Sequence, residues 1–132
     1  MERTAAEAIN EITERLAVLE DPLSQCDYLM MEGMKRKSVP DLRQDCYRIG
    51  GCRTAIWIEA RLVAGKAIFR MESDSLLVKG VFSLFDELYQ KRPVKEIREN
   101  TPSFLDIISD EVIYPEIKEN GLKKCYEKLA TL

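Results

Sequence analysis

Apolar residues recur every three or four positions through most of the chain, which is the spacing of helices that bury one face. At the N-terminus, Thr4 and Glu7 match a capping box ahead of an apolar stripe, and Asp21 followed by Pro22 is typical of a second helix start. The expected helices cover residues 5–19, 22–34, 75–89, 93–99, 102–109 and 116–130, and a polar connector covers 35–44.

Between the second and third of these helices the period of the apolar positions changes to two, which is the alternation of half-buried strands. The expected strands cover residues 46–49, 54–63 and 67–72. Three consecutive strands with short connections imply an antiparallel meander. The pattern therefore predicts an α+β fold, in which a small three-stranded antiparallel sheet packs against several helices in a single domain over residues 1–132.

Composition narrows the classes of function. The chain has 132 residues, 45% of them apolar and 33% charged, with a net charge of −3, so nothing indicates a basic surface for nucleic acid. No segment approaches the ~18 apolar residues of a membrane span. The start of the chain, residues 1–4, lacks the apolar core of a signal peptide, so we expect a cytoplasmic protein that binds neither nucleic acid nor membrane.

The chain contains four cysteines and no histidine, which excludes Ser-His-Asp and Cys-His catalysis and zinc sites with histidine ligands. Cys26 and Cys125 lie on apolar helical stripes, where a cysteine packs as a small hydrophobic residue. A disulfide between Cys46 and Cys52 is conceivable, but their spacing is not that of a redox motif. The four cysteines also lack the short spacing of a zinc site, so neither a metal nor a cofactor is expected.

Cys52 differs from the other cysteines because it follows Gly50 and Gly51 and precedes Arg53. Paired glycines mark a turn or a close approach of the backbone, and a neighbouring cation favours the thiolate. Two interpretations stay open on these residues alone. The thiol either closes a tight turn and points inward, or it is the nucleophile of a reaction.

Two blocks of sequence carry a family pattern. The first, IGGCRTAIW over residues 49–57, is similar to Val/Ile-x-Gly-Cys-x-Ser-x-Val-Trp, with Thr54 in place of the serine. The second, ESDSLLVKGV over residues 72–81, is similar to Asp-Ser-Asp-Ala-x-Ile-Val-Lys-Gly-Leu. With both blocks in this order, the chain resembles the SufE family of sulfur-acceptor proteins, which includes the CsdE proteins. Lys118 lies where that family typically has arginine before Asn-Gly.

The resemblance implies a SufE/NifU-like fold and a carrier of sulfane sulfur. Such a carrier accepts sulfur as a persulfide from a pyridoxal-phosphate cysteine desulfurase of the SufS/CsdA type, and it stimulates that enzyme. It delivers the sulfur to an iron–sulfur scaffold of the SufB type or to another acceptor. The family's acceptor cysteine falls on Cys52. Whether the carrier itself counts as an enzyme stays open, since it acts as a sulfurtransferase-like accessory.

Several residues are candidates to support Cys52 or to bind a partner: Gly50, Gly51, Arg53, Asp74, Lys79 and Lys118. For the pair Asp74 and Lys79 a structural interpretation is also open, in which Ser73 or Asp74 caps the third helix and Lys79 is solvated. A persulfide is easily lost to thiols and oxidants, so a carrier should shelter it and expose it on docking. We expect apolar residues to line the shelter, namely Ile56, Trp57 and Phe69.

Two further functions compete with the carrier. One is an activator that binds a desulfurase and stimulates it without accepting sulfur. The other is a metal-binding scaffold for clusters, against which the missing ligand pattern argues.

Overall fold

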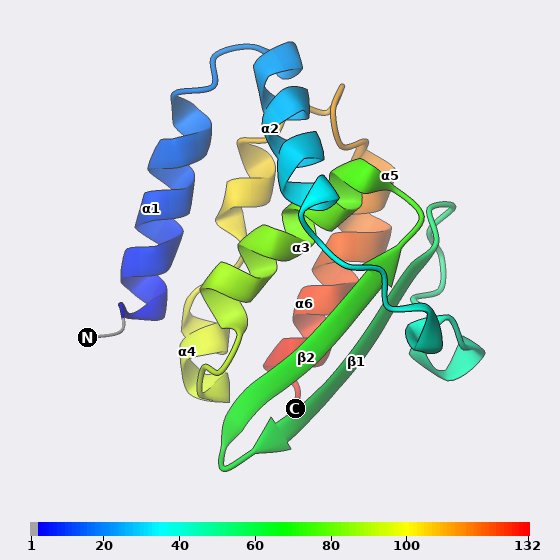
Figure 1. Ribbon diagram of the computed structural model, residues 1–132. Coiled ribbons are helices and arrows are strands. Elements are labelled where there is room, and N and C mark those ends of the chain that lie inside the picture. The colour runs from blue at the N-terminus through cyan, green and yellow to red at the C-terminus, as the bar shows by residue number, and fades with distance from the viewer. Residues whose placement is uncertain (1–2) are drawn as a thin grey trace.

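The computed structural model describes residues 3–132, in which helices gather along a two-stranded hairpin (Figure 1). The first two residues, part of the stretch where we expect no signal-peptide core, lie outside this range. The α-helices are α1 (Ala5–Ala17), α2 (Pro22–Met34), α3 (Leu76–Tyr89), α4 (Val94–Glu99), α5 (Pro115–Ile117) and α6 (Lys123–Ala130). The 3-10 turns are η1 (Pro40–Leu42), η2 (Asp45–Tyr47) and η3 (Ser103–Asp106), η4 (Lys118–Leu122) is a π-helical turn, and the strands are β1 (Ile56–Val63) and β2 (Lys66–Ser73). The α+β class is confirmed.

Local sequence signals set most helix ends. Thr4 and Glu7 form the expected capping box of α1, and Asp21 accepts a hydrogen bond from a backbone N–H at the start of α2. The helix predicted over 102–109 is wrong, because this segment forms only the short turn η3. Within residues 3–132, no helix has the length and apolar character needed to cross a membrane.

The start of α3 is capped by Ser75, and the prediction of Ser73 or Asp74 as the cap is wrong. The Ser75 hydroxyl accepts a hydrogen bond of 3.2 Å from the Val78 N–H. Ser73 instead accepts from the Ser75 N–H and donates to the carbonyl of Ala55 at 2.7 Å. Ser73 therefore ties the beginning of α3 to the segment that leads into β1.

The hairpin pairs β1 with β2 in antiparallel register, from Ile56 opposite Ser73 to Val63 opposite Lys66. Its turn consists of Ala64 and Gly65, which have φ values of 52° and 77°. Two successive positive φ values make the turn that matches the twist of a two-residue hairpin. The hairpin is therefore held at its tip by local backbone conformation.

The predicted third strand is wrong, and the sheet of residues 3–132 has two strands. Cys46 and Tyr47 lie in η2, where the N–H groups of Tyr47 and Arg48 bond to the carbonyls of Gln44 and Asp45. These local bonds use the donors that a strand would offer to its neighbour. Of residues 46–49, only Arg48 pairs with β1, and it does so as an isolated β-bridge. The predicted three-stranded meander is therefore reduced to the hairpin and this one bridge.

Both faces of the hairpin are covered. One face enters the hydrophobic core with alternating residues of both strands, namely Ile56, Ile58, Phe69 and Met71. On the other face Trp57 is 8% exposed, because the guanidinium groups of Arg43 and Arg48 lie 4.9 and 5.4 Å from its ring centroid. The connector between α2 and β1 thus covers this face of the hairpin.

Helices α2 and α3 approach each other to backbone distance through two glycines. A methyl group on Gly80 would lie 2.2 Å from the carbonyl oxygen of Leu29, and one on Gly33 would lie 2.2 Å from that of Leu76. Any other residue at either position would force the two helices apart.

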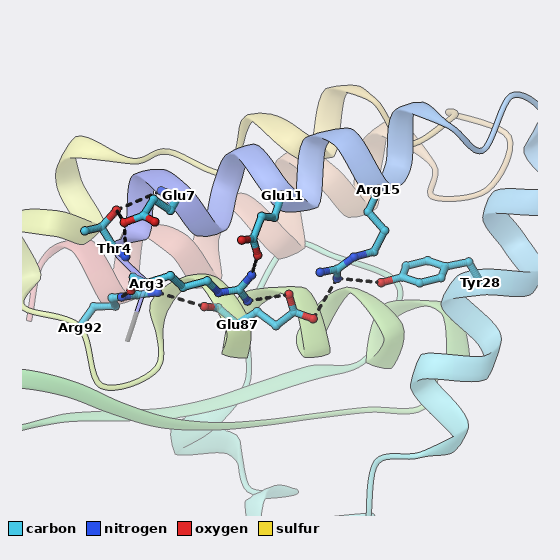
Figure 2. A network of polar contacts seen from close by, with 8 residues as sticks. All are labelled: Arg3, Thr4, Glu7, Glu11, Arg15, Tyr28, Glu87 and Arg92. Carbon is cyan, nitrogen blue, oxygen red and sulfur yellow. Dashed lines mark hydrogen bonds and ion pairs between the residues drawn. The ribbon is translucent and has the colours of Figure 1, made fainter. Parts of the chain in front are cut away.

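A polar network connects α1, α2 and α3 (Figure 2). The carboxylate of Glu87 accepts from Arg3 at 3.1 Å and from Arg15 at 2.9 Å, and Arg15 also donates to the Tyr28 hydroxyl. Arg3 forms a further ion pair with Glu11. The bond to Glu87 raises the pKa of Arg15, so this guanidinium stays charged.

Substitution of Gly80 by alanine tests the close packing of α2 on α3. We expect Gly80→Ala to lower the free energy of unfolding by about 1–3 kcal/mol, because the added methyl overlaps the carbonyl of Leu29. Gly50→Ala is the matched control, since no atom lies within 4 Å of the methyl that it adds. Denaturant unfolding of both variants decides, and equal stability of the two would contradict the packing argument.

Candidate functional site

The segment from Gly50 to Cys52 forms a turn between the bridge at Arg48 and strand β1. Gly51 has a φ of +85°, a left-handed conformation that favours glycine. The two glycines are exposed, whereas Cys52 is only 7% exposed. The turn that carries Cys52 therefore lies at the protein surface, while the Cys52 sulfur points into the protein.

The Cys52 sulfur lies against the C-terminal helical segment at Gly121. A methyl group on Gly121 would stand 3.2 Å from Cys52 Sγ and 2.8 Å from Ile56 Cδ1. Gly121 belongs to the π-helical turn η4, which interrupts the helix predicted over 116–130. Such π turns are frequent at functional sites. Gly121 leaves the space that the sulfur occupies.

Two hydrogen bonds fasten the same turn to the C-terminal segment. Lys124 Nζ donates to the Gly50 carbonyl at 2.9 Å, and the Arg53 N–H donates to Glu116 Oε1 at 3.2 Å. We call these two bonds the latch. The side chain of Arg53 is exposed, so the contact of this residue with the C-terminal segment is made by its backbone.

Sequence reasoning did not identify Gly121, Lys124 or Glu116 as parts of the site. Two of them lie on a predicted helix surface, where charged residues are common. Gly121 carried a usable signal, because a glycine inside a helical pattern indicates a kink or a close approach. The sequence contains no local sign of what approaches it.

The four cysteines are free thiols in different surroundings, and no disulfide joins Cys46 to Cys52. Cys46 is exposed on η2, and Cys26 is half-buried on α2. Cys125 is buried on α6, one turn after Gly121, and burial raises the pKa of its thiol to about 12, with a further contribution from charge on Cys52. Cys52 and Cys125 are both buried members of the hydrophobic core.

The expected apolar lining of Cys52 is correct for only part of the set. Ile56 lies beside the sulfur, as its distance from the Gly121 position indicates. Trp57 lies on the opposite face of the hairpin, because neighbouring strand residues point to opposite sides. Phe69 is buried in the core but pairs with Ala60, four residues along β1 from Ile56.

Asp74 and Lys79 belong to a charged cluster around Glu72, on the side of the hairpin that the connector covers. Asp74 is exposed and pairs with Arg43 at 2.5 Å, and Arg43 also lies 3.5 Å from the Glu72 carboxylate. Lys79 Nζ is 3.7 Å from Glu72, and its side chain is only 19% exposed, so the prediction of a solvated lysine is wrong. Within residues 3–132 no hydrogen bond or ion pair joins this cluster to Cys52.

Glu72 is buried at the centre of that cluster. Burial alone would raise the pKa of its carboxyl, but hydrogen bonds from Ser38, the Val39 N–H and the Ser73 N–H, together with the charge of Lys79, lower the pKa overall. The carboxylate is thus stabilised in its charged form. It attaches the connector to the outer face of β2.

Lys118 is buried at 6% exposure in η4. Its ammonium group donates to the carbonyl of Ile108 and to Asp110 Oδ1, the latter at 2.9 Å. A buried ammonium needs such partners to offset its desolvation. Lys118 therefore holds the loop before α5 against the segment that carries Gly121.

An open cavity of about 480 Å³ lies beside the turn. Its lining includes Arg48, Gly50, Lys124 and Lys128, so three cations surround the exposed edge of the turn. Within residues 3–132, no three cysteine, aspartate or glutamate side chains gather as ligands for a metal ion. The arrangement offers a thiol held against Gly121 and Ile56, beside a cavity whose lining includes these three cations and the carboxylate of Glu127.

Residues 10–132 match a family model described as SufE: Fe-S metabolism associated domain. An uncharacterized SufE-like protein of Synechocystis sp. is 26% identical over 122 residues, which cover 92% of this chain and 77% of that protein. SufE-like protein 1, chloroplastic/mitochondrial, of Arabidopsis thaliana is 24% identical over 116 residues, which cover 86% of this chain but only 31% of that longer protein.

A solved structure has the same fold. The solution structure of a hypothetical protein from Thermus thermophilus superposes with a TM-score of 0.70 at 18% sequence identity. The match covers 94% of this chain and 91% of the other. At this identity the likeness concerns the α+β architecture.

Substitution of Gly121 by alanine tests how Cys52 is held. We expect Gly121→Ala to displace the sulfur and to raise the rate of Cys52 alkylation by iodoacetamide about tenfold, since the overlap costs about 1–3 kcal/mol. Exposed Cys46 is the internal reference and should react at an unchanged rate, faster than Cys52 in the unsubstituted protein. An unchanged ratio of the two rates in the variant would refute the contact.

The lowered pKa of Glu72 predicts a dependence of stability on pH. Because the folded protein favours the carboxylate, its stabilisation is present above the usual value of 4.5 and is lost as the pH falls through the lower folded-state pKa. We expect Glu72→Gln to cost about 1–3 kcal/mol at neutral pH, with a smaller loss of stability on acidification than the unsubstituted protein. Exposed Asp74→Asn is the control and should cost less than about 1 kcal/mol. Parallel pH profiles of Glu72→Gln and the parent would contradict this assignment.

Proposed function

The chain belongs to the SufE family, whose domain is associated with iron–sulfur metabolism, and we propose that it carries sulfane sulfur as a persulfide on Cys52. The donor is a pyridoxal-phosphate cysteine desulfurase, and the recipient is an iron–sulfur scaffold or another sulfur acceptor. The observation on which this depends is the position of Cys52, a buried sulfur on an exposed glycine turn.

The chemistry needs only one thiol on this chain. The Cys52 thiolate attacks the terminal sulfur of the donor's persulfide, a new S–S bond forms, and the donor cysteine leaves as its thiolate. The transfer to the next acceptor repeats this exchange with Cys52 as the leaving group. Neither step requires histidine, which the chain lacks, and neither consumes an oxidant or a reductant.

The surroundings of Cys52 suit the storage of a labile sulfur. The thiol lies against Gly121 and Ile56 with little access to solvent, and small thiols and oxidants attack exposed persulfides. The donor must nevertheless reach the sulfur, so the turn has to swing outward. Gly51 already occupies a conformation that other residues avoid, which makes the turn a natural hinge.

The latch sets how easily the turn opens. Each of its two hydrogen bonds contributes about 0.5–1.5 kcal/mol, because water replaces a broken bond at the surface. A docking partner supplies far more free energy than that, so binding is enough to expose Cys52. In the free protein the closed turn stays the dominant state.

The remaining candidate residues serve as support in this proposal. Lys118 positions the segment that carries Gly121. Asp74 is exposed and pairs with Arg43, and Lys79 lies beside Glu72 on the connector side, where charged groups influence the encounter and orientation of a partner. Arg53 and the cations of the cavity beside Gly50 form the rim that a partner meets first.

Mass spectrometry of the thiols after incubation with a cysteine desulfurase and free cysteine tests the proposal. We expect the mass of one added sulfur on the peptide that contains Cys52, and an equal gain in the Cys46→Ser control. Cys52→Ser should take up no sulfur and should leave sulfide release at the rate of the desulfurase alone.

Two outcomes would overturn the carrier. The first is the absence of added sulfur on Cys52 in the unsubstituted protein. The second is full stimulation of the desulfurase by Cys52→Ser, which is the behaviour of an activator that binds without accepting sulfur.

A further inference from the structure

We infer that Cys52 and Cys125 form a reversible disulfide that protects the Cys52 thiol when the protein meets a peroxide. Cys125 comes from the C-terminal end of the chain and has no part in the proposed sulfur exchange. The pairing depends on where α6 lies and does not depend on the sulfur transfer itself.

The C-terminal segment carries Cys125 and also contacts the sulfur of Cys52. Cys52 Sγ lies 3.2 Å from the Cβ position at Gly121, and Cys125 is four residues further along, on the same helical face. In an α-helix, residues spaced in this way have Cβ atoms about 5–6 Å apart, and the helical segment runs without a break from the π-helical turn at Gly121 into α6. Both cysteines are buried members of the same hydrophobic core, and charge on Cys52 contributes to the raised pKa of the Cys125 thiol.

The turn can move the remaining distance. A disulfide requires Cβ atoms about 3.5–4.5 Å apart, while Cys125 is fixed in the core on α6. Cys52 lies outside every helix and strand and follows two glycines. The turn can therefore move along η4 toward Cys125 once the two latch bonds open, and this movement brings the sulfurs into bonding geometry.

The other two cysteines are placed for different contacts. Cys46 is exposed and lines a separate cavity with Tyr47, Glu59 and Lys128. Cys26 lies on α2 with its sulfur 3.8 Å from that of Met30. Among the four thiols, Cys125 is the one with a structural path to Cys52.

The reaction proceeds in two balanced steps. When the turn opens, the Cys52 thiolate becomes accessible and attacks the peroxide. The O–O bond breaks, and a sulfenic acid forms on Cys52 as one oxygen leaves as hydroxide or alkoxide. The Cys125 sulfur then attacks the Cys52 sulfur, the S–O bond breaks, and water leaves with the proton of Cys125. Two thiols are thereby oxidised to one disulfide while one peroxide is reduced.

The order of the two steps follows from burial. The Cys125 thiol is fully buried and has a pKa of about 12, so it does not react with a peroxide from solvent. It reacts only with a neighbour that is already oxidised. The disulfide diverts Cys52 from the irreversible sulfinic acid, and a thiol reductant restores both cysteines.

Peptide mapping of the peroxide-treated protein, without reduction and at low protein concentration, tests the inference. We expect a linked peptide pair containing Cys52 and Cys125, which a thiol reductant separates. The variant Cys46→Ala should give the same pair. In Cys125→Ala we expect at least about tenfold more Cys52 in the sulfinic state after the same exposure.

The peptide map of the unsubstituted protein tests the disulfide by itself, even if Cys125→Ala folds poorly. A Cys52 peptide linked to Cys46, or Cys52 in the sulfinic state beside an unmodified Cys125 thiol, would overturn the inference. Because no desulfurase is present, either result leaves the proposed sulfur transfer unaffected. Failure of sulfur transfer would likewise leave the disulfide standing.

Discussion

The approach of α2 to α3 at backbone distance is the contact that the rest of the structure depends on. Gly33 and Gly80 remove the side chains that would separate the two helices. α3 can then serve as the central helix, with α1 attached through Glu87 on one side (Figure 2). At its N-terminal end, Ser73 bonds to Ala55, three residues after Cys52. The segment that leads from Cys52 into β1 is thus held against the start of α3.

The site itself combines a buried sulfur with a weakly held backbone. The apolar contacts of Cys52 with Gly121 and Ile56 exclude water from the thiol. The latch bonds at Gly50 and Arg53 lie at the surface, where each contributes little free energy. In the proposed carrier, this balance would keep the turn closed in the free protein and allow a docking partner to open it.

The position of the Cys52 thiol depends on several residues that do not touch it. Lys118 offsets its own burial by binding Ile108 and Asp110, and in doing so it orients the segment that presents Gly121. On the outer face of the hairpin, Glu72 accepts a hydrogen bond from the connector and forms ion pairs with Lys79 and Arg43. These buried charges are costly unless paired, so each of them specifies one arrangement of the surrounding loops.

The sequence by itself determined the features that neighbouring residues control. The capping box at Thr4, the start of α2 at Asp21 and the hairpin were all readable from local patterns, because each depends on bonds within a few residues. The Gly-Gly-Cys turn was also readable, and with the second sequence block it indicated the family. The predicted third strand failed because local bonds in η2 and a single bridge at Arg48 replaced a ladder.

Only the tertiary structure decided what surrounds Cys52. Gly121, Lys124 and Cys125 lie about seventy residues further along the chain, and they reach the turn because the C-terminal segment packs against β1 and the core. Alternation along a strand placed Trp57 and Ile56 on opposite faces, but which face meets the sulfur depended on where that segment packs. Contacts between distant segments follow from how all the apolar faces are buried together, and no local pattern encodes that outcome.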